Sequence, residues 1–246
     1  MFGDFPLAHH KHGRSPGGRH GHGSCSIPPA IVAHANDGTP YQVDEDKLAF
    51  LQNEHVGPRT RGWRPLHRSI SRQEALQRLM TKPRVDAKLT AAIQRIQEAL
   101  AMPQAGHDLA IKMFPDLDLL LFHGQLRRRV YMRWATHVYP DCPFVPAQGV
   151  GVILGMTTPP GQRGQPRTAI HMNLTFPWLK AKRWDMIATV VHEMVHAWYC
   201  VLCGREAMVP DPMTKPGQDH AHGFYFHTGA EWVRAVLGKH IQQGNR

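Results

Sequence analysis

The stretch MIATVVHEMVHAWY, residues 186–199, decides the fold of this chain. It contains no glycine or proline and is almost entirely apolar, which is typical of a helix buried in a protein core. We expect this helix to run from about residue 183 to residue 202. His192 and His196 are four positions apart in it, so their imidazoles lie on one face and can reach a single metal ion. Glu193 lies beside them.

The His-Glu-His cluster in this helix would be costly to bury without a partner, and a metal ion is the simplest partner. Zinc lowers the pKa of a bound water from about 15.7 towards about 7, which yields a nucleophile at neutral pH. Glu193 could accept the proton from that water without being a ligand itself. The pattern therefore favours a catalytic Zn²⁺ site over the alternative, a pair of structural histidines satisfied within the core.

The third zinc ligand must come from elsewhere in the chain, because a catalytic zinc normally has three protein ligands and one open position. The downstream candidates are His220, His222 and the carboxylate of Glu231. We favour His222, because Gly223 follows it directly and an apolar helix is predicted to begin there. His220 ranks second and Glu231 third.

The rest of the chain predicts an α+β fold, in which the helix that carries the two histidines packs on a small sheet of three to four strands. Apolar residues recur at helical spacing or alternate with polar ones, and capping residues mark where helices begin. We expect further helices at residues 71–80, 86–102, 117–122 and 223–237, and strands at residues 130–134, 150–154 and 168–173.

Composition divides the chain into three parts. Residues 1–68 hold 9 of the 22 glycines, 7 of the 20 prolines and 8 of the 18 histidines, so a poorly ordered leader is expected there. Residues 69–104 are predicted to form a helical segment without a cluster of functional side chains. Residues 105–240 are predicted to form the domain that holds the candidate site.

Basic residues exceed acidic ones, which gives a formal net charge of +10. Such a balance favours polyanionic partners, including DNA, through contacts to phosphates. The alternative is a solvated basic surface. A local basic cluster lies within the predicted domain and could serve either role; it consists of Arg127, Arg128, Arg129, Arg133, Lys180, Lys182 and Arg183.

The four cysteines are too few and too scattered for a disulfide scaffold. No stretch approaches the roughly 20 uninterrupted apolar residues of a membrane span, and the N-terminus lacks the pattern of a secretory signal. We therefore expect a soluble intracellular protein without a membrane partner. Cys200 and Cys203 extend the helical face of His192 and His196. They could bind a structural zinc, but buried, apolar-like cysteines are the favoured interpretation.

Taken as a set, these motifs resemble the SprT-like (Spartan-type) zinc metallopeptidases. The resemblance covers about residues 105–240. It rests on the segments HEMVHA at 192–197, HGFYF at 222–226, LLFHGQL at 120–126 and IHMN at 170–173.

The resemblance implies a zincin-like domain with zinc ligands His192, His196 and His222 and with Glu193 as the catalytic base. It implies a hydrolase that cleaves protein substrates. Because members of this family act on proteins crosslinked to DNA, it also implies DNA–protein crosslink repair, DNA as a further partner, and the nucleus or the cytoplasm as the location, with the nucleus favoured.

Three features depart from the family pattern. The segment from His196 to His222 is longer than in the best-known members, no paired Cys-x-x-Cys zinc ribbon follows the domain, and no partner-docking tail is recognisable. Two other functions also stay open. One is a non-catalytic zinc-containing protein that binds nucleic acid or chromatin, and the other is a general peptidase that is indifferent to DNA.

Overall fold

The computed structural model describes twelve stretches of the chain: residues 31–34, 40–43, 69–101, 107–135, 137–139, 142–143, 153–160, 167–174, 176, 183–209, 213 and 222–242. Its helices are α1 (Arg72–Leu79), α2 (Ala87–Ala101), α3 (Asp108–Leu121), α4 (Arg183–Cys203) and α5 (Phe224–Gln242), with a 3-10 helix at Gly204–Met208. Its strands are β1 (Ile31–His34), β2 (Pro40–Val43), β3 (Val130–Ala135), β4 (His137–Tyr139), β5 (Cys142–Pro143), β6 (Gly155–Thr158) and β7 (Thr168–Asn173).

The central sheet has three strands in the order β3-β7-β6. Strand β7 pairs in parallel with β3 and antiparallel with β6, so β7 is the middle strand and β6 lies at one end of the order. Every residue of β7 is buried, as expected for the middle strand of the sheet. The fold is α+β, as predicted.

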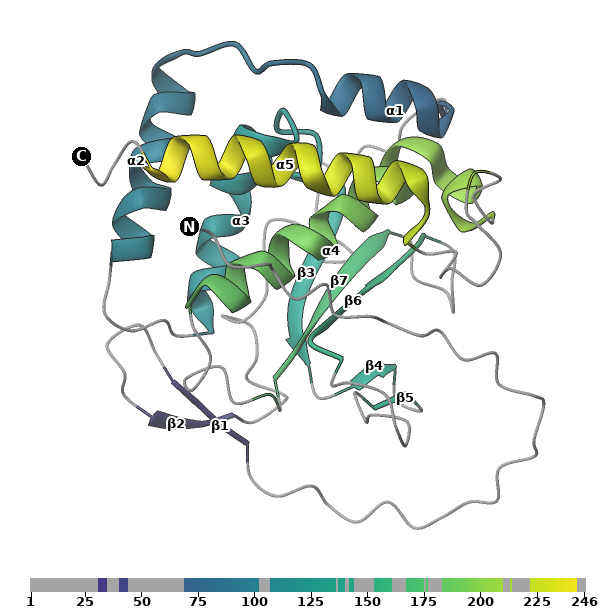
Figure 1. The fold of residues 1–246 in the computed structure, drawn as a ribbon. Coiled ribbons are helices and arrows are strands. Elements are labelled where there is room, and N and C mark those ends of the chain that lie inside the picture. The colour runs from purple at the N-terminus through teal and green to yellow at the C-terminus, as the bar shows by residue number, and fades with distance from the viewer. Residues whose placement is uncertain are drawn as a thin grey trace, which may run out of the picture.

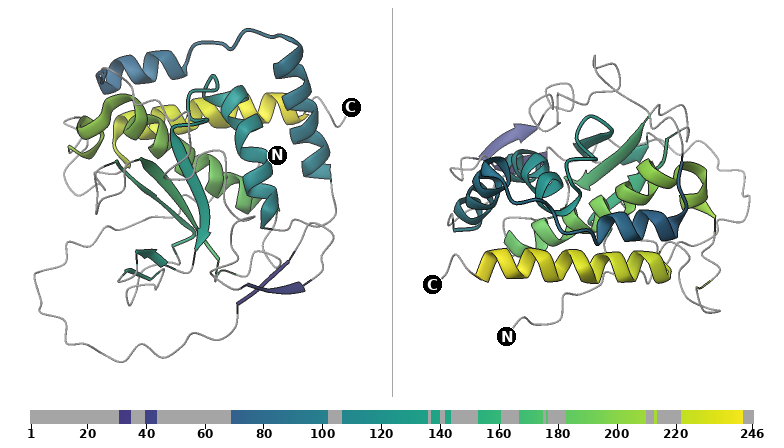
Figure 2. Two further views of the ribbon diagram at one scale, coloured as in Figure 1. Left: turned by 180° about the vertical axis from the view of Figure 1, so that it is seen from behind. Right: turned by 90° about the horizontal axis from the view of Figure 1, so that it is seen from above.

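The helices gather on one side of this sheet (Figures 1 and 2). Helix α4 lies against β6 and β7, and α5 crosses over the outer side of α4. Helix α1 packs on both α4 and α5, and α2 packs on α3. Helix α4 is long and apolar enough to cross a membrane, but most of it is buried inside the fold, as in the core helix of a globular domain.

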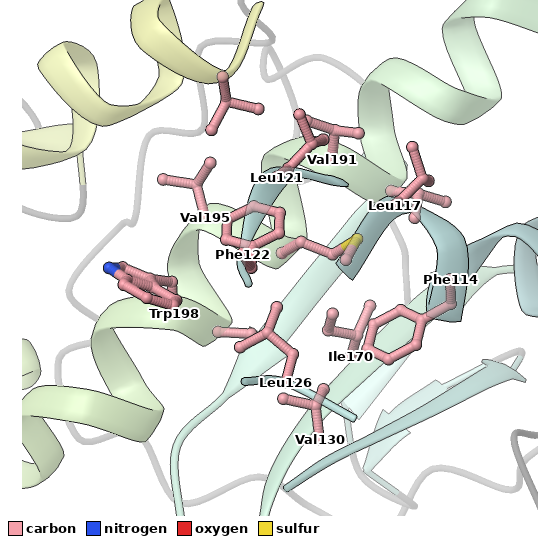
Figure 3. Close-up of a cluster of buried hydrophobic side chains, with 14 of the residues drawn as sticks. Phe114, Leu117, Leu121, Phe122, Leu126, Val130, Ile170, Val191, Val195 and Trp198 are labelled. Atoms are coloured by element: carbon pink, nitrogen blue, oxygen red, sulfur yellow. The ribbon is translucent and has the colours of Figure 1, made fainter. Parts of the chain in front are cut away.

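One hydrophobic core fills the space between these layers. Figure 3 shows side chains from α3, the turn after it, β3, β7 and α4 meeting in one cluster, among them Phe114, Phe122, Val130, Ile170 and Trp198. Burying each side chain of this size stabilises the fold by about 1.5–3 kcal/mol. The core therefore holds α4 firmly against the sheet.

Helix α1 belongs to this core, although the sequence predicts a separate helical segment at residues 69–104. Ala75 and Leu79 of α1 are completely buried. The indole Nε1 of Trp198 on α4 donates a 3.1 Å hydrogen bond to the carbonyl oxygen of Ala75. The backbone N–H of Ile70 donates a 2.9 Å bond to the carbonyl of Leu202, near the end of α4. Residues 69–101 and the predicted domain thus share one core.

Helix α3 is longer than the predicted helix at residues 117–122, because it begins at Asp108. The helix continues through Pro115, a residue that costs about 3 kcal/mol in a helix interior and usually marks its end. A buried stripe at helical spacing offsets that cost; it is formed by Leu109, Ala110, Met113, Phe114, Leu117, Leu120 and Leu121.

The strand predicted at residues 150–154 is displaced along the chain. Strand β6 begins at Gly155, whereas residues 153–154 are irregular and residues 150–152 lie outside the described residues. The alternating apolar residues there favoured a strand, but pairing with β7 selects Gly155–Thr158 instead.

Two short strands, β1 and β2, lie within the predicted leader and pair antiparallel. Neither strand is predicted by the sequence pattern of this segment. The rest of residues 1–68 lies outside the described residues, so the poor order of the leader stays a prediction.

Candidate metal centre

Three histidines converge at one point between α4 and the start of α5. His192 and His196 are half-buried on α4, and His222 is buried two residues before α5 begins. The Nε2 atom of His222 lies 3.1 Å from Nε2 of His196 and 3.2 Å from Nε2 of His192. The ligand atoms of the three residues all lie within 4.8 Å of one another.

These distances fit the coordination shell of a small divalent metal. Nitrogen ligands about 2.0–2.1 Å from a tetrahedral zinc ion are about 3.3 Å from each other. Hydrogen bonds between the rings explain these distances less well than a metal ion does. A neutral His222 ring with its hydrogen on Nε2 can donate to His192 or to His196, but not to both. The three imidazoles therefore form a donor set that suits a metal ion with one position left open.

Phe226 packs against all three imidazole rings. Its ring is stacked on His196 with centroids 4.2 Å apart, and its edge contacts are 4.9 Å to His192 and 4.7 Å to His222. The histidine rings themselves are 4.9–5.1 Å apart. One apolar ring thus contacts every histidine of the site and restricts how the imidazoles can turn, as neighbours of metal ligands commonly do.

Glu193 is almost completely buried beside this cluster, with 2% of its surface exposed. Burial raises the pKa of its carboxyl to about 7, and hydrogen bonds from Thr157 partly oppose that shift. The hydroxyl Oγ1 of Thr157 lies 2.7 Å from Oε2 of Glu193 and 2.9 Å from its backbone carbonyl oxygen. Thr157 lies on strand β6, so its contact with Oε2 holds the carboxylate between α4 and the sheet.

Gly155, two residues before Thr157 on β6, leaves the room that Glu193 occupies. A Cβ atom at position 155 would lie 2.9 Å from Cγ and 3.2 Å from Oε1 of Glu193. Real Cβ atoms essentially never approach a neighbour so closely, so no larger residue fits there without displacing Glu193. The sequence reasoning identified neither β6 residue, because nothing in a short Gly-Met-Thr-Thr strand shows which helix it faces.

The structure describes two of the three candidates for the third ligand. His222 joins His192 and His196, whereas Glu231 is exposed on α5 and does not belong to the group. His220 lies outside the described residues.

Cys200 and Cys203 are buried and do not form a disulfide. They are not part of the histidine group. Burial raises the pKa of both thiols to about 12. This disfavours the thiolate, which is the form of cysteine that binds metals. The favoured interpretation of the sequence, buried apolar-like cysteines, agrees with this environment.

Four residues of the predicted basic cluster have described side chains, and two of these four are exposed. Arg127 and Arg128 face solvent, and Arg129 is half-buried. The Nε of Arg133 donates a 3.0 Å hydrogen bond to Nδ1 of His171 across the sheet. The side chains of Lys180, Lys182 and Arg183 lie outside the described residues.

Comparison of the chain with protein-family models, curated proteins and solved structures gives no match.

Proposed function

We propose that this protein is a zinc-dependent endopeptidase of the SprT-like, zincin-like type. The observation that carries the proposal is the meeting of three imidazole Nε2 atoms beside the buried carboxylate of Glu193. Imidazole suits several transition metals, and three histidines with an open position are one of the known ligand sets of catalytic zinc.

A zinc ion held by His192, His196 and His222 would polarise the scissile carbonyl and activate a water for attack at neutral pH. Glu193 would accept the proton of the attacking water and pass it to the leaving amine, so one carboxylate would serve first as base and then as acid. Its burial excludes bulk water from the proton that it carries.

An extended protein chain is the substrate that the sheet accommodates best. Within the described residues, β6 pairs with β7 alone, so its other edge can add a strand of substrate by main-chain hydrogen bonds. Because Thr157 of β6 contacts Glu193, a peptide on that edge would run beside the base. This arrangement favours an endopeptidase that accepts unfolded or flexible segments.

DNA-bound or DNA-crosslinked proteins are the substrate class that we propose, with the nucleus as the favoured location. The net charge of +10 and the exposed Arg127 and Arg128 support this proposal, because cationic side chains bind phosphates without regard to sequence.

The test measures cleavage of a denatured protein and of a DNA-crosslinked protein by the zinc-loaded full chain, with a chelator as control. Glu193→Gln should retain zinc but cleave at least about 100-fold more slowly, because the base is lost while the ligands remain. Glu231→Gln, which changes an exposed acid on α5, is the matched control and should cleave normally.

The outcome also separates the two other functions. Zinc and DNA binding without cleavage of either substrate would favour a non-catalytic zinc protein that binds nucleic acid or chromatin. Cleavage that added DNA does not stimulate, at any salt concentration, would favour a general peptidase.

A further inference from the structure

Strand β6 contacts Glu193 at two positions of the same strand face. Gly155 and Thr157 are two residues apart, so both lie on the face towards α4, whereas Met156 and Thr158 lie on the other face. Gly155 provides space for the Glu193 side chain, and Thr157 supplies a hydroxyl to it. A steric and a polar contact thus act together on one carboxylate.

The hydroxyl of Thr157 has one hydrogen and two acceptors within reach, and both belong to Glu193. Whichever acceptor it serves, the bond fixes Glu193 relative to β6. The shorter distance, 2.7 Å, is to Oε2, and a bond to this oxygen restricts the carboxylate, which is the part of Glu193 that could turn because its backbone lies within α4.

The strand that supplies these contacts is itself fixed. Gly155 is paired with Met172 and Thr157 with Ile170 in the antiparallel ladder to β7, whose residues are all buried. A side chain held by such an element keeps its position better than one held by a loop. We infer that Gly155 and Thr157 of β6 are positioning residues for the carboxylate of Glu193, an inference that rests on the proposed peptidase function.

Two Thr157 variants separate the hydroxyl from the shape of the side chain. Thr157→Val keeps a β-branched residue of the same size but has no hydroxyl, whereas Thr157→Ser keeps the hydroxyl. Thr157→Val should lower kcat by about 10- to 100-fold with KM changed less than about twofold, because a misplaced group loses about that much rate. Thr157→Ser should recover most of that loss.

Gly155→Ala tests the steric contact independently. Gly155 does not have a positive φ, so alanine fits its backbone, and the three atoms nearest to the new methyl group all belong to Glu193. This variant should also lower kcat while zinc content stays stoichiometric. It decides the inference if Thr157→Val does not fold.

Thr158→Val is the matched control on the opposite face of the strand. The hydroxyl of Thr158 lies 3.2 Å from Nε2 of His171 and 3.4 Å from the carbonyl of Ala169, away from Glu193. The control should lower the melting temperature and leave kcat unchanged. Equal loss of kcat in Thr157→Val and Thr158→Val would overturn the inference, as would a normal kcat in Thr157→Val.

Crystal structures of the zinc-loaded Thr157→Val and Thr157→Ser proteins give a readout that does not depend on activity. The carboxylate of Glu193 should leave its wild-type position in the valine variant and keep it in the serine variant. An unmoved carboxylate in Thr157→Val overturns the positioning role. If the carboxylate is displaced in Thr157→Val but the wild-type protein cleaves no protein, the positioning role is supported and the peptidase function is rejected. The two failures are therefore distinguishable.

Discussion

The hydroxyl of Tyr199 on α4 donates a 2.7 Å hydrogen bond to the backbone carbonyl oxygen of Tyr225 in the first turn of α5. Tyr199 follows His196 by three residues, and Tyr225 follows His222 by three residues. The bond therefore joins the helix that carries two of the candidate metal ligands to the segment that carries the third. It holds the start of α5 in the position that brings His222 close to His192 and His196.

Tyr199→Phe should weaken zinc binding without removing a ligand. One neutral hydrogen bond contributes about 1 kcal/mol, so the dissociation constant should rise about fivefold. Competition with a chromophoric chelator measures it. Tyr225→Phe, which removes a hydroxyl from the same turn but keeps the acceptor carbonyl, should bind zinc as the wild type does. Wild-type affinity in Tyr199→Phe would show that the bond does not help to assemble the site.

His222→Ala should bind zinc at least about 100-fold more weakly than the wild-type protein, because even loss of a neighbour of a ligand costs 10- to 100-fold. His196→Ala should do the same. Metal analysis of the purified proteins after dialysis measures the loss.

His220→Ala and Glu231→Ala serve as controls for the alternative third ligands, and both should retain one zinc ion per chain. Loss of zinc in either control, with full occupancy in His222→Ala, would assign the third ligand to the other residue.

Gly229 permits the close approach of α5 to α1 and α4. A Cβ atom there would lie 3.0 Å from Cδ2 of Leu79 and 3.0 Å from the hydroxyl of Tyr199. Gly229→Ala should therefore destabilise the fold by about 1–3 kcal/mol through overpacking, although alanine is the better helix former. Chemical denaturation measures the free energy of unfolding.

Gly238, on the same helix, gives the matched comparison. A Cβ atom at this position meets nothing within 4 Å. Gly238→Ala should therefore stabilise the protein by up to about 1 kcal/mol through helix propensity alone. If both alanine variants were stabilised equally, the close packing at Gly229 would not limit α5.

His171 should make the stability of the protein fall in acid. Burial, and then the charge of Arg133, lower the pKa of His171 to about 3. Since Nδ1 accepts a hydrogen bond from Arg133, the hydrogen of the neutral ring lies on Nε2, next to the hydroxyl of Thr158. A proton on Nδ1 would break this arrangement.

The unfolded chain takes up this proton near the ordinary histidine pKa of about 6.5, and the folded chain only near 3. The stabilisation of the folded state that depends on neutral His171 is therefore fully present above about pH 6.5. It is lost as the pH falls towards 3, by at most about 1.4 kcal/mol per pH unit. His171→Gln should be less stable at pH 7 and should lack this slope. Denaturation of the metal-free proteins at pH 7, 6 and 5 tests it, and parallel pH curves would contradict the assignment.

Two central elements, α4 and β7, were predicted from the sequence alone. A long apolar stretch without glycine or proline favours a helix over a strand, and α4 at Arg183–Cys203 agrees with the predicted residues 183–202. Strand β7 at Thr168–Asn173 was predicted to the residue, directly after the Pro/Gly-rich stretch at 159–166 of the sequence. These elements depend on short-range periodicity, which a sequence displays directly.

Other features depended on contacts that a sequence does not display. Helix α3 runs through Pro115 because its buried face compensates for the missing bond, and β6 occupies Gly155–Thr158 because β7 pairs with it there. The pattern of apolar residues instead predicted a helix at residues 117–122 and a strand at residues 150–154.

The candidate site divides in the same way. The sequence determined that His192 and His196 share a helix face with Glu193 next to them, because a helix repeats every 3.6 residues. Only the tertiary structure decided that the Nε2 atom of His222 lies near theirs and that a threonine of β6 holds the carboxylate. Both contacts join residues at least 26 positions apart, and the packing of α5 and the sheet against α4 sets such distances.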